Sequence, residues 1–129
     1  MTDSPANIVS ALQQRWTAAF NQRDIEGLVA LYADESSLFG GKPELSVNPA
    51  GVRAYFSALP AAQVQAEFGE QTAVRLAPTV VTSAGFVTFT LVDGDAPSAP
   101  MFYRITFTLV DAGGEWKIAS HHASPSPAS

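Results

Sequence analysis

Two adjacent histidines, His121 and His122, are the side chains of this chain best suited to chemistry, because an imidazole titrates near neutral pH. An imidazole inside a pocket could act as a general acid or base, or contact a ligand. Neighbouring residues of a strand point to opposite faces, so only one of the two can enter a pocket and together they cannot chelate one metal ion. The simpler alternative is a histidine that fixes a strand end through a hydrogen bond.

The segment 101–110 decides which histidine faces inward. Its odd positions are the more apolar and are predicted to face the interior: Tyr103, Ile105, Phe107 and Leu109. A regular hairpin around residues 112–114 pairs Val110 with Trp116. This register turns His121 inward, beside Ile105 and Tyr103.

The same register predicts the outer face of the strands. It places His122 opposite Arg104, either as a cross-strand pair at a subunit interface or as a site for an anion. It leaves Val110, Trp116 and Ile118 as an outer apolar strip, which predicts a homodimer through that face. A bulge at the glycine pair would instead reverse the last strand and exchange the two histidines.

Aromatic side chains are predicted to build an apolar pocket around the inward histidine. The predicted ligand-binding residues are Trp16, Phe20, Tyr32, Tyr55, Tyr103 and His121. The hydroxyls of Tyr32 and Tyr55, both expected on helices, could orient a substrate oxygen, although aromatic residues at such spacing are often simply core. No carboxylate falls on an apolar strand face, so the sequence does not predict a buried carboxylate base.

Three helices are predicted in the first half of the chain. Ser4-Pro5 is an N-cap followed by proline at the first helical position. The apolar stripe that follows has four-residue spacing: Ile8, Leu12, Trp16 and Phe20. Asp24 is expected to cap a short second helix that carries Tyr32. Asn48-Pro49 repeats the pattern of a cap followed by proline and is expected to begin a third.

Alternating β-branched and aromatic residues replace the helical pattern in the second half, as in residues 86–91 and 102–109. Short turns between these runs require antiparallel pairing. The sequence therefore predicts an α+β fold, with three N-terminal helices packed on a curved antiparallel sheet that ends in a four-stranded meander. One domain is expected over residues 1–124, followed by a flexible tail at 125–129.

The composition excludes several classes of function. The chain has 129 residues, the size of one domain, and is 47% hydrophobic and 15% charged, as in folded proteins. A net charge of −5 without a basic cluster disfavours binding to nucleic acids or anionic membranes. There is no cysteine, no signal peptide pattern and no apolar run of membrane-spanning length. We therefore expect a cytoplasmic protein without a metal or cofactor.

The closing segment 114–125, in which Trp116 precedes the double histidine, resembles the NTF2-like superfamily. It is most similar to the branch with the calcium/calmodulin-dependent kinase II association domain and the SnoaL-like and SgcJ/EcaC-type groups. Segments 30–34 and 103–107 are similar to the same branch. The resemblance implies a cone-shaped fold with an internal pocket, and dimers or rings formed through the sheet.

The kinase association domain has arginines in an anion-binding pocket, and the resemblance puts Ala123 and Phe107 at those two positions. It therefore does not imply a carboxylate-binding pocket of that kind.

Three functions remain open from the sequence. The first is a homodimeric protein that binds a small apolar molecule. The second is a SnoaL or SgcJ/EcaC-type enzyme acting on a hydrophobic or polyketide-like substrate, with His121 as acid or base. The third is an oligomeric assembly module without a ligand.

Overall fold

Helix α1 (Pro5–Asn21) begins where the sequence predicted it. The computed structural model describes residues 3–59, 63–93, 96–97 and 99–127. The hydroxyl of Ser4 accepts a hydrogen bond from the Asn7 amide at 3.1 Å, which satisfies one of the free N–H groups of the first turn. The predicted apolar stripe is buried, and it carries Trp16 and Phe20 into the interior.

The second helix is shorter than predicted. Asp24 caps α2 (Ile25–Val29) by accepting from the Gly27 amide, but the helix ends before Tyr32. Tyr32 is instead the first residue of β1 (Tyr32–Phe39), so its predicted position on a helix was wrong. A single turn is too short to be stable alone, and pairing with the sheet extends the chain directly after it.

Helix α3 (Asn48–Ser57) follows a two-residue strand, β2 (Ser46–Val47). The predicted cap was wrong in detail, because Val47 occupies the cap position and makes no side-chain bond. The Asn48 side chain accepts from the Ser36 amide at 3.2 Å, which ties the start of the helix to β1.

The predicted meander is confirmed and makes up one side of the sheet, from the edge strand inward. Its strands are β3 (Gln63–Ala77), β4 (Val80–Asp93), β6 (Met101–Ala112) and β7 (Glu115–Pro125), all paired antiparallel in sequence order. The full order is β2-β1-β7-β6-β4-β3, with the short β5 (Ala96–Pro97) paired to β4. β1 joins β7 in parallel, so the sheet is mixed, whereas the sequence predicted an antiparallel one.

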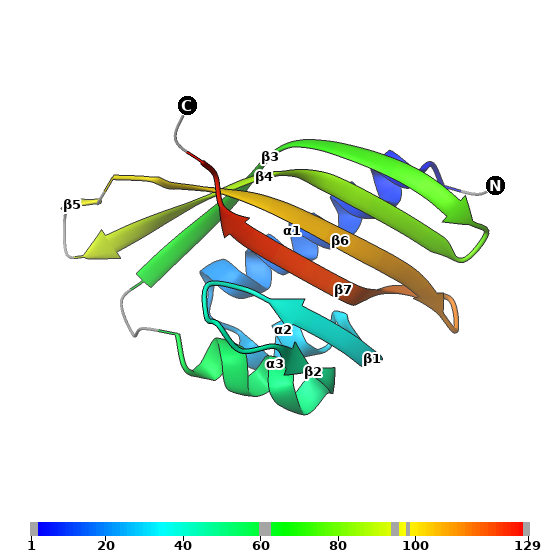
Figure 1. Ribbon diagram of the computed structural model, residues 1–129, viewed down its shortest axis with the longest axis horizontal. Coiled ribbons are helices and arrows are strands. Elements are labelled where there is room, and N and C mark those ends of the chain that lie inside the picture. The colour runs from blue at the N-terminus through cyan, green and yellow to red at the C-terminus, as the bar shows by residue number, and fades with distance from the viewer. Residues whose placement is uncertain (1–2, 60–62, 94–95, 98, 128–129) are drawn as a thin grey trace.

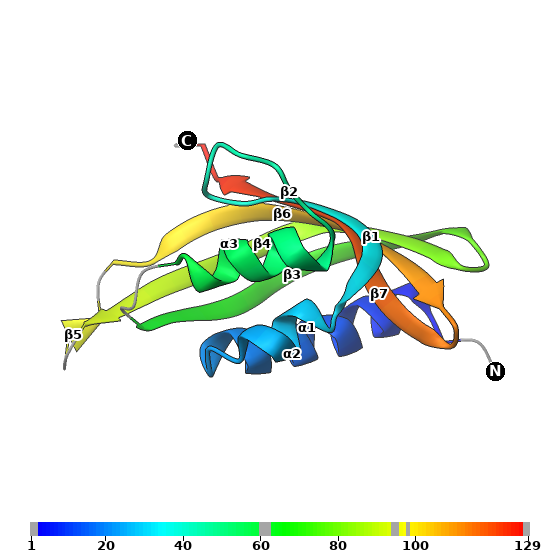
Figure 2. The same cartoon turned by 90° about the horizontal axis from the view of Figure 1, so that it is seen from below.

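The sheet curves over the three helices, which all lie on its concave side (Figures 1 and 2). The apolar core fills the space between these layers, and the α+β arrangement is as predicted.

β7 extends to Pro125, and the Ser126 amide donates to the Phe102 carbonyl at 2.9 Å, so pairing continues past the predicted boundary at residue 124. In the described part of the chain, no helix has the length and apolarity needed to cross a membrane.

The turn between β6 and β7 is one residue shorter than predicted. Only Gly113 and Gly114 form it, both with positive φ (66° and 95°), the conformation that a two-residue hairpin turn requires. Val110 consequently pairs with Lys117, whereas the regular register predicted Trp116 as its partner.

A bulge further along β7 compensates for this shift. Leu109 pairs with Ile118, but Thr108 pairs with Ser120, so Ala119 has no partner on β6. The extra residue reverses the alternation of β7 beyond this point.

The two shifts have opposite consequences for the predicted faces. His121 points inward, with 5% of its surface exposed. The regular register also predicted an inward His121, but beside Ile105, whereas its partner in the structure is Phe107. The predicted outer strip was wrong: Ile118 is fully buried and Trp116 packs against the core, because the short turn puts both on the inner face. Of the three residues, only Val110 keeps its predicted outward position. Its partner Lys117 lies between Trp116 and Ile118, which both face inward, so this pair faces outward.

This register predicts different costs for two aliphatic truncations. Ile118→Ala should lower the free energy of unfolding by about 2–5 kcal/mol, because it opens a cavity in the core. Val110→Ala, on the outer face, should lower it by less than about 1 kcal/mol. Urea denaturation of both variants tests the assignment, and equal losses would contradict it.

Candidate functional site

A cavity of about 340 Å³ lies between the helices and the concave face of the sheet. The described residues that line it are Trp16, Phe20, Gly40, Gly41, Tyr55, Phe56, Leu59, Val64, Phe89, Leu91, Met101, Tyr103, His121 and Ala123. Five of the six predicted ligand-binding residues are among them. The sixth, Tyr32, lies behind the lining and contacts His121.

Sequence reasoning missed the part of the lining that comes from loops and strand ends. Phe56 and Phe89 occupy apolar positions of a predicted helix and a predicted strand. The sequence does not show that they lie at the same cavity as His121. Gly40 and Gly41 carry no side-chain signal, and they line the cavity because β1 ends there.

A chain of three hydrogen-bonding side chains ends at the cavity. The indole N–H of Trp16 donates to the Tyr32 hydroxyl oxygen at 3.1 Å. That oxygen lies 2.8 Å from Nδ1 of His121. The three residues come from α1, β1 and β7 and are nearly fully buried, so the chain joins distant segments through the core.

The directions of these bonds follow from the requirement that buried polar groups be paired. The Tyr32 hydroxyl accepts from the indole, so its own hydrogen is satisfied if it donates to Nδ1 of His121. Nδ1 is then the unprotonated nitrogen, and the imidazole carries its hydrogen on Nε2. Among the described residues, Nε2 has no hydrogen-bond partner, and the ring lines the cavity.

Burial keeps this imidazole uncharged. Desolvation, with a smaller contribution from the nearby His122, lowers the pKa of His121 from 6.5 to about 3. Burial also raises the pKa of the Tyr32 hydroxyl far above its ordinary value of 10, although the bond from Trp16 opposes this shift. At neutral pH the cavity therefore contains a neutral imidazole that can donate one hydrogen bond.

Tyr55 closes one side of the cavity against the loop after β1. Its hydroxyl oxygen accepts from the Gly41 amide at 2.9 Å, and burial raises its pKa. The ring passes so close to Gly40 that a Cβ there would overlap the hydroxyl, which explains glycine at this position. Tyr103 packs edge-on against Phe89 with ring centroids 5.3 Å apart, and its hydroxyl forms no hydrogen bond with a described residue.

The described lining contains no aspartate, glutamate, lysine or arginine. His121, Tyr55 and Tyr103 are its polar side chains. The cavity therefore suits a largely apolar molecule with one or two oxygen atoms and offers little to a charged one.

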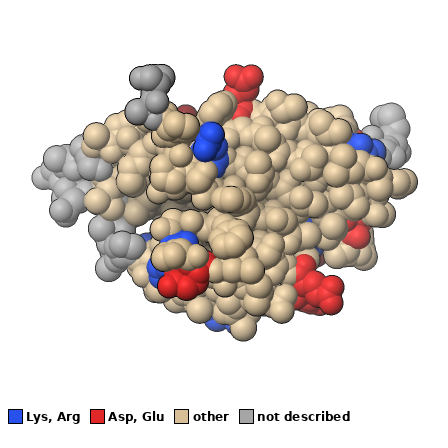
Figure 3. Space-filling model, viewed as in Figure 1, with Lys and Arg blue, Asp and Glu red and all other residues tan. Residues whose placement is uncertain are grey.

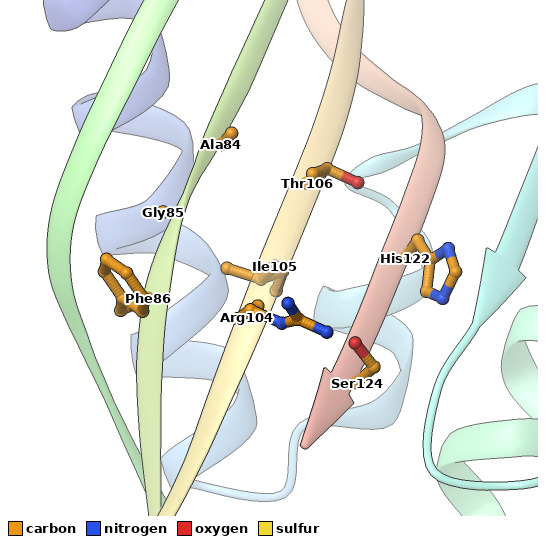
Figure 4. A pocket seen from close by; sticks show the side chains of 8 residues that line it. All are labelled: Ala84, Gly85, Phe86, Arg104, Ile105, Thr106, His122 and Ser124. Carbon is orange, nitrogen blue, oxygen red and sulfur yellow. The ribbon is translucent and has the colours of Figure 1, made fainter. Parts of the chain in front are cut away.

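Arg104 and His122 lie outside this cavity, on the convex face of the sheet. They line a separate hollow, shown in Figure 4. The predicted cross-strand pair was wrong, because the shorter turn and the bulge together place Ser124 opposite Arg104 and Thr106 opposite His122.

The sequence matches the family of SnoaL-like domains over residues 9–129. None of the curated proteins matches it. A protein from Xanthomonas campestris assigned to the calcium/calmodulin-dependent protein kinase II association domains has a similar structure, with 26% identity and a TM-score of 0.87 over 98% of this chain and 91% of that one.

Two further solved structures share the fold. The protein Aln2 from a Streptomyces species is 17% identical, with a TM-score of 0.86 over 97% of this chain and 94% of that one. An NTF2-like protein with a cystatin-like fold from Novosphingobium aromaticivorans is 13% identical, with a TM-score of 0.83 over 97% and 84%. The chain belongs to the SnoaL-like family and has the NTF2-like fold, as the resemblance implied.

The lowered pKa of His121 predicts a pH-dependent stability. Between pH 6.5 and about 3, the unfolded chain binds a proton that the folded chain excludes. The free energy of unfolding should therefore fall as the pH decreases through this window, by up to about 1.4 kcal/mol per pH unit from this group.

Urea denaturation between pH 7 and pH 5, above the range in which most carboxylates titrate, measures this contribution. His121→Gln should remove most of the slope, whereas the matched variant of the exposed neighbour, His122→Gln, should keep it. Equal slopes in wild type and His121→Gln would show that His121 is not a buried neutral imidazole.

Proposed function

We propose that this protein binds a compact, largely apolar molecule with an acceptor oxygen, such as a ketone, in the cavity beneath the sheet. One observation carries the proposal: the hydrogen-bond chain from Trp16 through Tyr32 fixes a neutral His121 with its Nε2 hydrogen at an apolar cavity. Nothing among the described residues accepts this hydrogen, so a ligand oxygen in the cavity can do so.

The size and lining of the cavity support the same class of ligand. At about 340 Å³, it falls at the lower end of the range of roughly 300–1,000 Å³ for small-molecule sites. Apolar and aromatic side chains supply most of its surface. The hydroxyls of Tyr55 and Tyr103 give a second point at which a ligand oxygen can bind.

The described residues support binding better than acid–base catalysis. A base needs a pKa near the working pH, and that of His121 is lowered to about 3. Its Nδ1 is also occupied by Tyr32. If this protein is an enzyme acting on a hydrophobic or polyketide-like substrate, His121 acts as a neutral donor that polarises a substrate oxygen, a role known for neutral imidazoles.

A pair of ligands with the same rings tests the proposal. 1-Tetralone carries a ketone that tetralin lacks. By isothermal titration calorimetry, 1-tetralone should bind wild type about 2- to 10-fold more tightly than tetralin, the range expected for one hydrogen bond. His121→Leu should abolish the difference, and His122→Gln should preserve it.

A second variant tests whether both ligands bind in this cavity. Leu91→Trp adds volume to the lining and should weaken both ligands, with a melting temperature close to that of wild type. Failure of both ligands to bind wild type would reject this ligand class and favour a module that assembles without a ligand.

We still propose a homodimer through the convex face of the sheet, but with different residues in the contact. The exposed apolar side chains of the convex face include Phe86 and Phe102, which are 52% and 63% exposed. They replace Trp116 and Ile118, which are turned inward.

A further inference from the structure

A second groove, of about 630 Å³, lies between α1 and β3. Because α1 runs along the concave side of β3, the edge strand of the sheet, we call it the edge groove (Figure 2). None of its described lining residues belongs to the cavity at His121. It also lies away from the convex face, the largely uncharged surface in Figure 3 through which the homodimer is proposed.

The described lining of the edge groove is polar but uncharged. Its polar side chains are those of three glutamines, one serine and one threonine, and Val9 and Phe68 add apolar surface. No aspartate, glutamate, lysine, arginine or histidine is among these lining residues. A charged ligand would find no opposite charge there, so the edge groove suits a neutral molecule that forms hydrogen bonds.

Gln13 lines this groove with an amide that has no partner in the protein. Only 6% of its surface is exposed. Its backbone carbonyl accepts from the Thr17 hydroxyl at 2.8 Å, but its terminal amide bonds to no described residue, and Nε2 is buried. The neighbouring Gln14, by contrast, is exposed and donates to Ser10 at 3.3 Å. Buried polar groups are normally paired, so the free amide of Gln13 points to a ligand.

A bulge in β3 turns a second glutamine toward the same groove. Gln71 lies three residues beyond Phe68, but their partners on β4 are only two residues apart, so Gln71 stays on the inner face. Gly85 leaves room for it, because a Cβ there would lie 2.5 Å from Cδ of Gln71. Nε2 of Gln71 donates to the Phe86 carbonyl at 2.9 Å, whereas Oε1 is buried and has no partner among the described residues.

We propose that the edge groove binds a neutral primary carboxamide carried on an apolar body. A primary carboxamide has a carbonyl oxygen beside an NH₂ group, so it can pair with the terminal amide of Gln13 through two hydrogen bonds, one in each direction. This match holds whichever way the oxygen and nitrogen of Gln13 are oriented. The second hydrogen of the NH₂ group can be donated to Oε1 of Gln71, and Val9 and Phe68 suit the apolar body.

Three probes with the same ring test the proposal. Benzamide carries the proposed group, N,N-dimethylbenzamide lacks both amide hydrogens, and benzoate is charged and lacks them too. Each is titrated into ¹⁵N-labelled protein, and the backbone amide shifts of residues 13, 69 and 71 are followed. Gln13→Leu removes the free amide, and Gln22→Leu, at an exposed glutamine beyond the end of α1, is the matched control.

Benzamide should cause saturable shifts at these residues and bind about tenfold or more tightly than either of the other probes, because they cannot form the pair with Gln13. Gln13→Leu should weaken benzamide to a similar degree, and Gln22→Leu should leave it unchanged. The melting temperature of Gln13→Leu should be no lower than that of wild type, since its terminal amide has no partner in the protein to lose.

Ser10→Phe is a second variant in case Gln13→Leu folds poorly. Ser10 is exposed on α1 and lines the groove, so the larger side chain should fill it and weaken benzamide. Absence of saturable benzamide shifts, equal binding of the three probes, or benzamide binding unchanged in Gln13→Leu would overturn the proposal. Binding of 1-tetralone should be unchanged in Gln13→Leu, so failure at the edge groove is distinct from failure of the proposed ketone site.

Discussion

A polar side chain buried in an apolar core is costly unless it is paired, and one series of hydrogen bonds pairs three such side chains in this protein. Trp16, Tyr32 and His121 bond to one another from a helix and two strands that are distant in sequence, and Nε2 of His121 is left facing the cavity. The indole of Trp16 and the imidazole of His121 both bond to the hydroxyl of Tyr32. The position of α1 and the parallel pairing of β1 with β7 are therefore coupled to the protonation state of this imidazole. The single imidazole donor at the cavity follows from this arrangement.

The register of the last strand makes this chain possible. A two-residue turn at Gly113 and Gly114 places Ile118 in the core, and an unpaired Ala119 then returns His121 to the same face. Without the bulge, the regular alternation of a strand would put His121 on the convex face. Bulges commonly redirect a side chain beside a functional site, and this one directs an imidazole into a cavity.

Much of the fold could be predicted from patterns that act over short distances. The cap at Ser4, the helical stripe and the alternation of β6 each report a local preference, and the structure follows them. The position of Tyr32 in a strand could not be read in this way, because the pairing of β1 with a strand about 85 residues later overrides the helical pattern. The bulge at Ala119 has no local signal either, since alanine fits a regular strand equally well.

The positions of the candidate residues could largely be predicted from the sequence, but their hydrogen bonds and charge state could not. Aromatic residues and one inward histidine could be assembled from periodicity, and the structure gathers five of the six at one cavity. The neutral state of His121 depends on its burial and on Tyr32, which only the tertiary structure supplies. The outer hollow at Arg104 likewise depends on the shifted pairing with Ser124.

The central claim is that His121 is a neutral imidazole with its hydrogen on Nε2, held by Tyr32. Long-range ¹H–¹⁵N correlation spectra at pH 7 test it directly, because protonated and unprotonated ring nitrogens have well-separated shifts. We predict an unprotonated Nδ1 and a protonated Nε2 for His121 in wild type, and a change in the Nδ1 shift in Tyr32→Phe. A charged ring, or a hydrogen on Nδ1, would contradict the account.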